Sequence, residues 1–132
     1  GPNRPLYPFG FGLSYASFEY SGLALSAEKL VSGGKIVASV KVRNSGRVAA
    51  AETVQLYVRD NVGSVVRPVK ELKGFRKITL DAGEEKEVSF DITEDMLAFY
   101  NADLEKKAEK GAFTVFIGGD SNCSLSAGFT LE

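Results

Sequence analysis

Histidine and tryptophan are both absent from this sequence of 132 residues. Without histidine the chain cannot form a Ser-His-Asp or Cys-His catalytic arrangement, or a metal site that includes imidazole. Cys123 is the only cysteine, which excludes an internal disulfide and a CxxC metal or redox pair. The sequence also lacks the dense DxDxDG loop that calcium binding would require. We therefore expect no metal and no cofactor.

The charges offer no long-range attraction for a polyanion. Sixteen Lys and Arg residues face 17 Asp and Glu residues, which leaves a formal net charge of −1. Strong electrostatic binding to nucleic acid or to anionic lipid is therefore not expected. No stretch approaches the roughly 18 to 20 consecutive apolar residues of a membrane helix, and no basic n-region precedes an apolar h-region. We expect a soluble domain with neither nucleic acid nor membrane as a partner.

The length fits a single domain of ordinary size, able to bury about two thirds of its unfolded surface. Gly1 is the first residue and Met96 is the only methionine, so we expect a processed or excised piece of a longer chain. From Ser17 onward, apolar and polar residues alternate in short stretches separated by turn residues. This alternation indicates half-buried strands. The clearest stretches are residues 35–43, 54–59, 71–80, 87–92, 113–117 and 124–131.

Turn residues separate these stretches. Residues 44–46 (Asn-Ser-Gly) and 81–83 (Asp-Ala-Gly) favour reversals, because Asn and Gly tolerate positive φ angles. In the stretch 71–80, Phe75 is out of phase with Leu72 and Leu80, which predicts a bulge or bend at Gly74.

Helical periodicity is almost missing. Thr93, followed by two acids, predicts one helical turn over residues 94–97. About seven short strands predict an all-β fold, an antiparallel β-sandwich of the immunoglobulin-like or fibronectin type III-like kind. The missing Cys-Trp-Cys pattern argues against an antibody domain. We predict an irregular N-terminal strap over residues 1–16 and the sandwich over residues 17–132.

The predicted strap is rich in aromatic side chains. Residues 6–15 read LYPFGFGLSY, and exposure of these rings would be costly, since burial of each contributes roughly 1.5 to 3 kcal/mol. Proline and glycine in this stretch oppose regular structure, so we expect an irregular segment that lies on a surface. That surface is either another domain or the chain's own sandwich. The candidate docking residues are Tyr7, Phe9, Phe11 and Tyr15.

Three further residues are candidates for contacts. Arg67, beside Pro68, suits a bidentate contact with a carboxylate of another domain, and pairing with Glu71 is the alternative. Tyr57 and Phe116 occupy the outward phase of their strands and are candidates for a sugar-stacking platform. Contact with a loop or with a neighbouring domain is the alternative for this pair.

No catalytic residue is assigned. Retaining hydrolysis of a glycoside needs two carboxyl groups about 5 to 5.5 Å apart in one pocket. The acids here gather around the predicted turn near Glu84 and the predicted cap near Glu94, where solvated charge explains them. Cys123 is interpreted as an inert, partly buried thiol, because nothing nearby in sequence would lower its pKa.

Two stretches resemble a known family. LYPFGFGLSY at residues 6–15 and RPVKELKGF at residues 67–75 resemble the fibronectin type III-like domain at the C-terminus of glycoside hydrolase family 3 enzymes, chiefly bacterial beta-glucosidases. The resemblance continues through TVQLYV at residues 53–58 and FTVFIGGDS at residues 113–121, so it covers nearly the whole chain. Ala82 departs from the family pattern, which usually has proline in this turn.

The resemblance implies a parent enzyme that hydrolyses beta-glucosides with retention, using an Asp nucleophile and a Glu acid/base in upstream domains. Neither residue is carried onto this chain. The chain would then be a non-catalytic accessory domain that docks on the catalytic domains of the same polypeptide, its expected partner. The alternatives are an independent carbohydrate-binding module, with polysaccharide as partner, and a cell-surface adhesion repeat. By resemblance, a periplasmic or secreted location is favoured over the cytoplasm.

Overall fold

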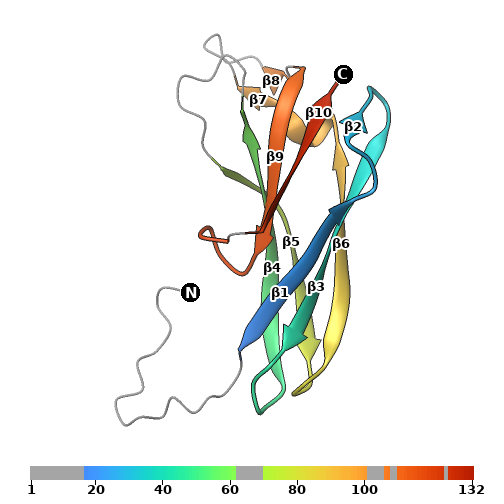
Figure 1. The fold of residues 1–132 in the computed structure, drawn as a ribbon. Coiled ribbons are helices and arrows are strands. Elements are labelled where there is room, and N and C mark those ends of the chain that lie inside the picture. The colour runs from blue at the N-terminus through green and yellow to red at the C-terminus, as the bar shows by residue number, and fades with distance from the viewer. Residues whose placement is uncertain (1–16, 62–69, 101–105, 108–109, 124) are drawn as a thin grey trace.

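The structure is a computed structural model that describes residues 17–61, 70–100, 106–107, 110–123 and 125–132 (Figure 1). These residues form ten strands and one short 3-10 helix. In chain order the elements are β1 (Phe18–Leu25), β2 (Lys29–Leu30), β3 (Lys35–Asn44), β4 (Ala50–Asp60), β5 (Glu71–Leu80), β6 (Glu85–Thr93), η1 (Asp95–Leu97), β7 (Phe99–Tyr100), β8 (Lys106–Lys107), β9 (Gly111–Gly118) and β10 (Ser126–Leu131).

Two sheets make up the body of the fold. One has the strand order β1-β3-β6 and the other has the order β2-β10-β9-β4-β5. All pairings are antiparallel except the two-residue contact between β2 and β10. The seven strands of six or more residues confirm the predicted antiparallel sandwich. The long strands run along the long axis of the molecule, and the small β7–β8 pair lies at one end (Figure 1).

The core lies between the two sheets. The period-two alternation of β3 and β4 places one set of side chains inward and leaves the other set toward solvent. Phe113 is the largest fully buried side chain, and its ring stacks on Phe129 with 5.5 Å between the ring centroids. The predicted helical turn is present as η1, and its Leu97 is fully buried in the same core.

A bulge interrupts β5. The register shifts between Leu56 and Tyr57 of β4, and Lys73 has no partner of its own across the ladder. This is the irregularity predicted at Gly74. The bulge matters for the outer surface, because Phe75 next to it points away from the core and is 62% exposed.

The turn between β5 and β6 shows why Ala82 is a natural position for proline. The amide of Glu84 donates to the carbonyl of Asp81 at 2.9 Å, and Gly83 has a φ of 81°. A hydrogen bond of this kind with positive φ at the third residue is typical of a type II turn, whose second position favours proline.

We expect Ala82→Pro to raise the free energy of unfolding by about 0.4 to 1 kcal/mol, because proline restricts the unfolded chain and the second position of a type II turn favours it. Urea unfolding of the 132-residue chain measures this change. Ala82→Gly is the matched control and should change stability in the opposite direction. A proline variant less stable than the parent would contradict the assigned turn geometry.

Candidate functional site

A row of three apolar side chains crosses the outer face of the five-stranded sheet. Tyr57 of β4 lies opposite Leu72 of β5 on one side and opposite Phe116 of β9 on the other. Directly opposed residues of an antiparallel pair share one face of the sheet. The neighbours of Tyr57 in β4, Leu56 and Val58, are fully buried in the core, so the row faces away from it. We call Leu72, Tyr57 and Phe116 the outer-face row.

Two cations cover one end of this row. The Nζ atom of Lys70 lies 4.4 Å from the ring centroid of Phe116, and the guanidinium carbon of Arg59 lies 5.1 Å from it. These are cation–π distances. Lys70 also donates to the carbonyl of Ser121 at 2.9 Å, and Arg59 donates through Nε to Oδ1 of Asn61 at 3.0 Å. As a result, Phe116 is only 8% exposed although it lies outside the core.

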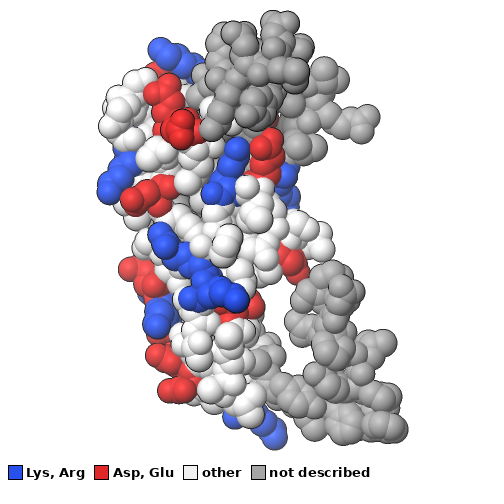
Figure 2. Space-filling view, turned by 180° about the vertical axis from the view of Figure 1, so that it is seen from behind, with Lys and Arg blue, Asp and Glu red and all other residues white. Residues whose placement is uncertain are grey.

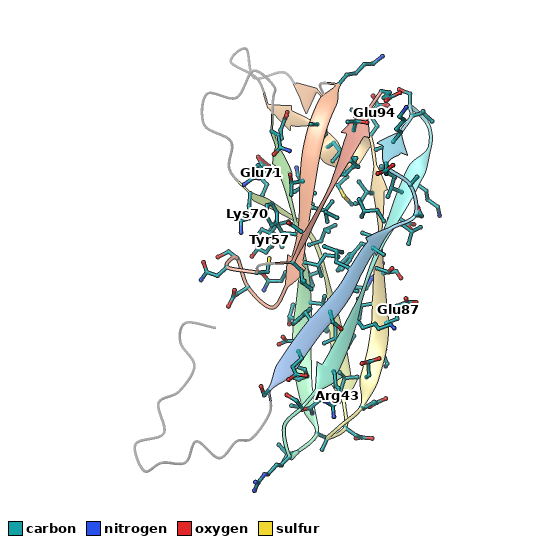
Figure 3. The ribbon with its side chains drawn as sticks, in the orientation of Figure 1. Arg43, Tyr57, Lys70, Glu71, Glu87 and Glu94 are labelled. Atoms are coloured by element: carbon teal, nitrogen blue, oxygen red, sulfur yellow. The ribbon has the colours of Figure 1, made fainter. Side chains whose placement is uncertain are left out.

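Tyr57 is held by a chain of hydrogen bonds to the β9–β10 connection. Its hydroxyl donates to Oε1 of Gln55, and Nε2 of Gln55 donates to the carbonyl of Gly119 at 3.2 Å. Burial, followed by the nearby Cys123 and Asp120, raises the pKa of Tyr57. The phenol therefore stays neutral at physiological pH. Figure 3 shows Tyr57, Lys70 and Glu71 along the same side of the molecule.

The face of the molecule seen from behind carries charges of both signs. Lys and Arg side chains are interspersed with Asp and Glu side chains over the back of the molecule (Figure 2). Within the described ranges, no group of three or more His, Cys, Asp or Glu residues is arranged to hold a metal ion. Nor does that part of the chain contain a helix long and apolar enough to cross a membrane.

Described residues line two shallow surface hollows. One of about 420 Å³ lies beside β9 and β10, and Glu28 is the only carboxylate among its described lining residues. The other, of about 280 Å³, is lined by Tyr20, Cys123 and the β9–β10 connection, with no carboxylate among the described residues. Neither hollow brings two described carboxyl groups together in the way that glycoside hydrolysis requires.

Tyr20 and Glu52 link the two sheets beside the second hollow. The hydroxyl of Tyr20 in β1 donates to Oε2 of Glu52 in β4 at 2.8 Å. A Cβ atom added at Gly119 would lie 2.7 Å from the same carboxylate oxygen, so the connection passes very close to this contact. Burial, followed by the hydrogen bond to Glu52 and its charge, strongly raises the pKa of Tyr20.

A family model described as the fibronectin type III-like domain matches residues 52–121, which is more than half of the chain. The chain belongs to the fibronectin type III-like domain family. The matched segment contains the whole outer-face row and both of its cations.

The relatives of this fibronectin type III-like domain are much longer proteins. It is 50% identical over 119 residues to a periplasmic beta-glucosidase of Salmonella typhimurium, covering 90% of this chain and 16% of that protein. It is 48% identical over 117 residues to a beta-xylosidase of Formosa agariphila, covering 89% of this chain and 16% of that protein. The chain thus spans about a sixth of the length of the curated relatives it matches.

A solved structure shows the same fold. A mutant beta-glucosidase from Listeria innocua, in complex with laminaribiose, aligns with a TM-score of 0.80 and 40% identity. The alignment covers 98% of this chain and 18% of that one. The resemblance inferred from the sequence motifs is therefore confirmed.

The predicted docking residues of the fibronectin type III-like domain fall outside the described residues. Their contacts therefore stay predictions. These residues are Tyr7, Phe9, Phe11, Tyr15 and Arg67.

The predicted sugar platform is only partly open. Tyr57 and Phe116 do share the outer face, as their phase predicted, and Tyr57 is half-buried. Phe116, however, is covered by Lys70 and Arg59, which occupy the ring face that a sugar would use. Binding of sugar by this pair remains a prediction.

Cys123 is half-buried as expected, and burial raises the pKa of its thiol.

One residue of this site departs from the period-two phase of its strand. Leu72 shares the phase of Leu80 in the sequence, but Leu80 is fully buried, whereas Leu72 lies outward opposite Tyr57 and is 51% exposed. The bulge at Lys73 reverses the phase of β5, so every position before it faces the other way. The sequence signal was Gly74, which predicted the bulge but not its consequence for Leu72.

Loss of the Tyr20 hydroxyl gives a test at alkaline pH. The pKa of Tyr20 is raised in the folded state, so its neutral hydroxyl stabilises the fold. This contribution to the free energy of unfolding is fully present below the unfolded pKa of about 10 and is lost as pH rises above that value. We expect Tyr20→Phe to be less stable than the parent at pH 8 by about 1 to 2 kcal/mol. The difference in free energy of unfolding between the parent and this variant should shrink between pH 10 and pH 11.5. The decrease should be less than about 1.4 kcal/mol per pH unit, because Tyr20 is partly exposed and solvent screens its interaction with Glu52.

Urea unfolding at pH 8, 10 and 11.5 measures the two proteins side by side. Tyr57 titrates in both, so its contribution cancels in the comparison. A difference that stays constant across this range would contradict the link between Tyr20 and Glu52.

Proposed function

We propose that this chain is a non-catalytic accessory domain of a glycoside hydrolase family 3 enzyme, which hydrolyses O-glycosyl bonds of beta-glucosides. In this role the domain docks on the catalytic domains of the same polypeptide and stabilises them. One observation carries the proposal. About half of the residues are identical to those of glycosidases over nine tenths of this chain, while the chain matches only 16% of their length.

The docking role is proposed for the aromatic residues of the strap, Tyr7, Phe9, Phe11 and Tyr15, with Arg67 as a charged contact. Aromatic and Arg side chains are the usual anchors of protein interfaces, because they bury a large area with few rotors to immobilise. Packing of the strap on its own sandwich is the alternative. Protection of these rings from hydroxyl-radical oxidation only in the full polypeptide would favour docking over self-packing.

The test compares the 132-residue chain with the full polypeptide that carries it. Hydrolysis of an aryl beta-glucoside is expected from the full polypeptide and not from the chain alone. Replacement of Phe9 and Phe11 by serine should lower the thermal inactivation temperature of the full polypeptide while KM for the glucoside stays unchanged. Hydrolysis by the purified chain would overturn the proposal.

A periplasmic or secreted location is also proposed. It is supported by the Salmonella typhimurium relative, which is a periplasmic beta-glucosidase. Fractionation of cells that express the full polypeptide tests the location directly, with activity expected outside the cytoplasmic fraction.

The second candidate is a carbohydrate-binding module centred on Tyr57, which is favoured only by the outward position of its ring. Calorimetric titration of the 132-residue chain with a beta-glucan tests it. Saturable binding that Tyr57→Ala abolishes would establish the carbohydrate-binding module. A titration that releases and absorbs no heat of binding would reject this second candidate.

A further inference from the structure

We propose that the outer-face row, with Phe75 beside it, is the surface through which the sandwich itself contacts the catalytic body of the same polypeptide. This inference rests on the proposed function and names a docking surface beyond the strap. Its occupant is a protein surface that is apolar at its centre and carries carboxylate or carbonyl oxygens where it meets Lys70 and Arg59.

Exposure of large apolar side chains is the first argument. Leu72 is 51% exposed and Phe75 is 62% exposed, and both project from the outer face of β5. β5 is an edge strand of its sheet. Proteins usually protect such edges with charge or cover them, because an apolar edge invites association. Together with the half-buried Tyr57, these side chains share the outer face of two paired strands, so they are not single residues scattered over the surface.

Charge is the second argument. Besides the Phe116 ring, Lys70 and Arg59 contact the neutral oxygens of Ser121 and Asn61, and neither forms an ion pair within the described part of the chain. The nearest acid of β5, Glu71, is already paired with Lys73 at 3.3 Å. The Phe116 end of the patch is therefore basic, while Asp120 is the acid near Tyr57. The complement of the Phe116 end is a surface that carries negative groups.

The covering of Phe116 disfavours a sugar stacked on that ring. Sugar stacking requires an open aromatic face, but both cations already lie over this ring. Leu72 adds an aliphatic side chain, which offers no flat ring to a pyranose. An apolar centre that combines aromatic side chains with Arg is instead typical of protein interfaces.

Covalent linkage makes the catalytic body the fitting occupant. This chain matches only 16% of the length of these relatives, so about five sixths of each relative is further polypeptide tethered to the domain. Tethering gives a high effective concentration, and a modest patch is then enough to hold the two surfaces together. Interfaces between domains of one chain are typically small and mixed in polarity, as this patch is.

Hydroxyl-radical footprinting of the full polypeptide and of the 132-residue chain tests the inference. Leu72 and Phe75 are expected to be oxidised several-fold more slowly in the full polypeptide. Val31, which is 57% exposed and lies between β2 and β3, is the internal control and should react equally in both. Equal oxidation of Phe75 in both proteins would overturn the inference.

The same experiment distinguishes this inference from the proposed function. Protection of the strap residues Phe9 and Phe11 without protection of Phe75 would leave the accessory role intact and reject this surface. Absence of protection at all three positions would reject both.

Introduction of a negative charge into the patch provides a second readout. Phe75→Glu and Leu72→Glu should lower the melting temperature of the full polypeptide by several degrees, while Val31→Glu, the matched control, leaves it unchanged. In the 132-residue chain all three variants should melt within about 2 °C of the parent, because these side chains are exposed there. Equal melting of the full-length variants and the control would contradict the inference, as would saturable binding of laminaribiose that Phe75→Glu abolishes.

Discussion

Replacement of Phe113 by alanine is expected to lower the free energy of unfolding of the chain by about 3 to 5 kcal/mol. Phe113 is fully buried and is the largest side chain in the core with no exposed surface. It pairs directly with Phe129 across β9 and β10, and their rings stack with 13° between the planes. Removal of the ring would take away both the burial of Phe113 and the packing partner of Phe129.

The size of this effect follows from the rigidity of the site. β9 is paired on both sides, by β10 and by β4, so the backbone cannot move inward to fill the space left by the ring. A cavity therefore remains, and its cost adds to the loss of hydrophobic burial. Domains of this size have about 5 to 15 kcal/mol of total stability, so the change would remove a large share of it.

Urea unfolding followed by far-ultraviolet circular dichroism measures this loss. Phe75→Ala is the matched control, because the same truncation at a ring that is 62% exposed should change stability by less than about 0.5 kcal/mol. Phe113→Leu should cost less than Phe113→Ala, since most of the volume is kept. A loss below about 1 kcal/mol for Phe113→Ala would show that the core is not packed as described.

The sandwich was predictable because its strands carry a local signal. In β3, Ile36, Ala38, Val40 and Val42 alternate with solvent-facing residues, and all four are buried as that pattern requires. Local alternation is sufficient here because one face of β3 lies toward the core and the other toward solvent. The turns at residues 44–46 and 81–83 were predictable for a similar reason, since their glycine and Asn preferences are also local.

The candidate site was less predictable because its contacts join distant parts of the sequence. The alternation of apolar and polar residues along β4 and β9 predicted an outward position for both Tyr57 and Phe116. Nothing in this alternation indicated that Lys70 would cover Phe116. The hydrogen bond between Tyr20 and Glu52 joins residues 32 positions apart in different sheets, and it depends on how the two sheets face each other. Such contacts follow from tertiary packing, which periodicity does not encode.

Asn44 is a second residue whose contacts periodicity could not predict. Its sequence context indicated a turn residue, and the structure shows that its side chain is also fully buried. Its side-chain Nδ2 donates to the carbonyls of Val48 at 2.8 Å and Leu80 at 3.1 Å, while Oδ1 accepts from the amide of Gly46 at 2.9 Å. Leu80 belongs to the opposite sheet. One side chain thus closes the β3–β4 turn and ties it across to the end of β5.

We expect Asn44→Ala to lower the free energy of unfolding by about 2 to 4 kcal/mol, because three backbone groups lose their partner at once. A buried polar group left without a hydrogen bond costs about 1 to 3 kcal/mol. The groups near the turn are partly accessible, so water replaces some of the lost bonds there, whereas the Leu80 carbonyl contact is buried. Urea unfolding at pH 7 measures the loss, and a change below about 1 kcal/mol would contradict this network.

Asn44→Asp separates the hydrogen bonds from the size of the side chain. The carboxyl group has nearly the same shape and can still accept from Gly46, but when ionised it cannot donate to Val48 or Leu80 and faces their carbonyl oxygens instead. Burial beside these carbonyls should raise the pKa of the new carboxyl above its unfolded value of about 3.9. The stability of the variant, relative to the parent, should therefore be highest below pH 4 and fall as pH rises toward 7. A pH-independent difference would mean that donation from Nδ2 is not what holds the turn to the opposite sheet.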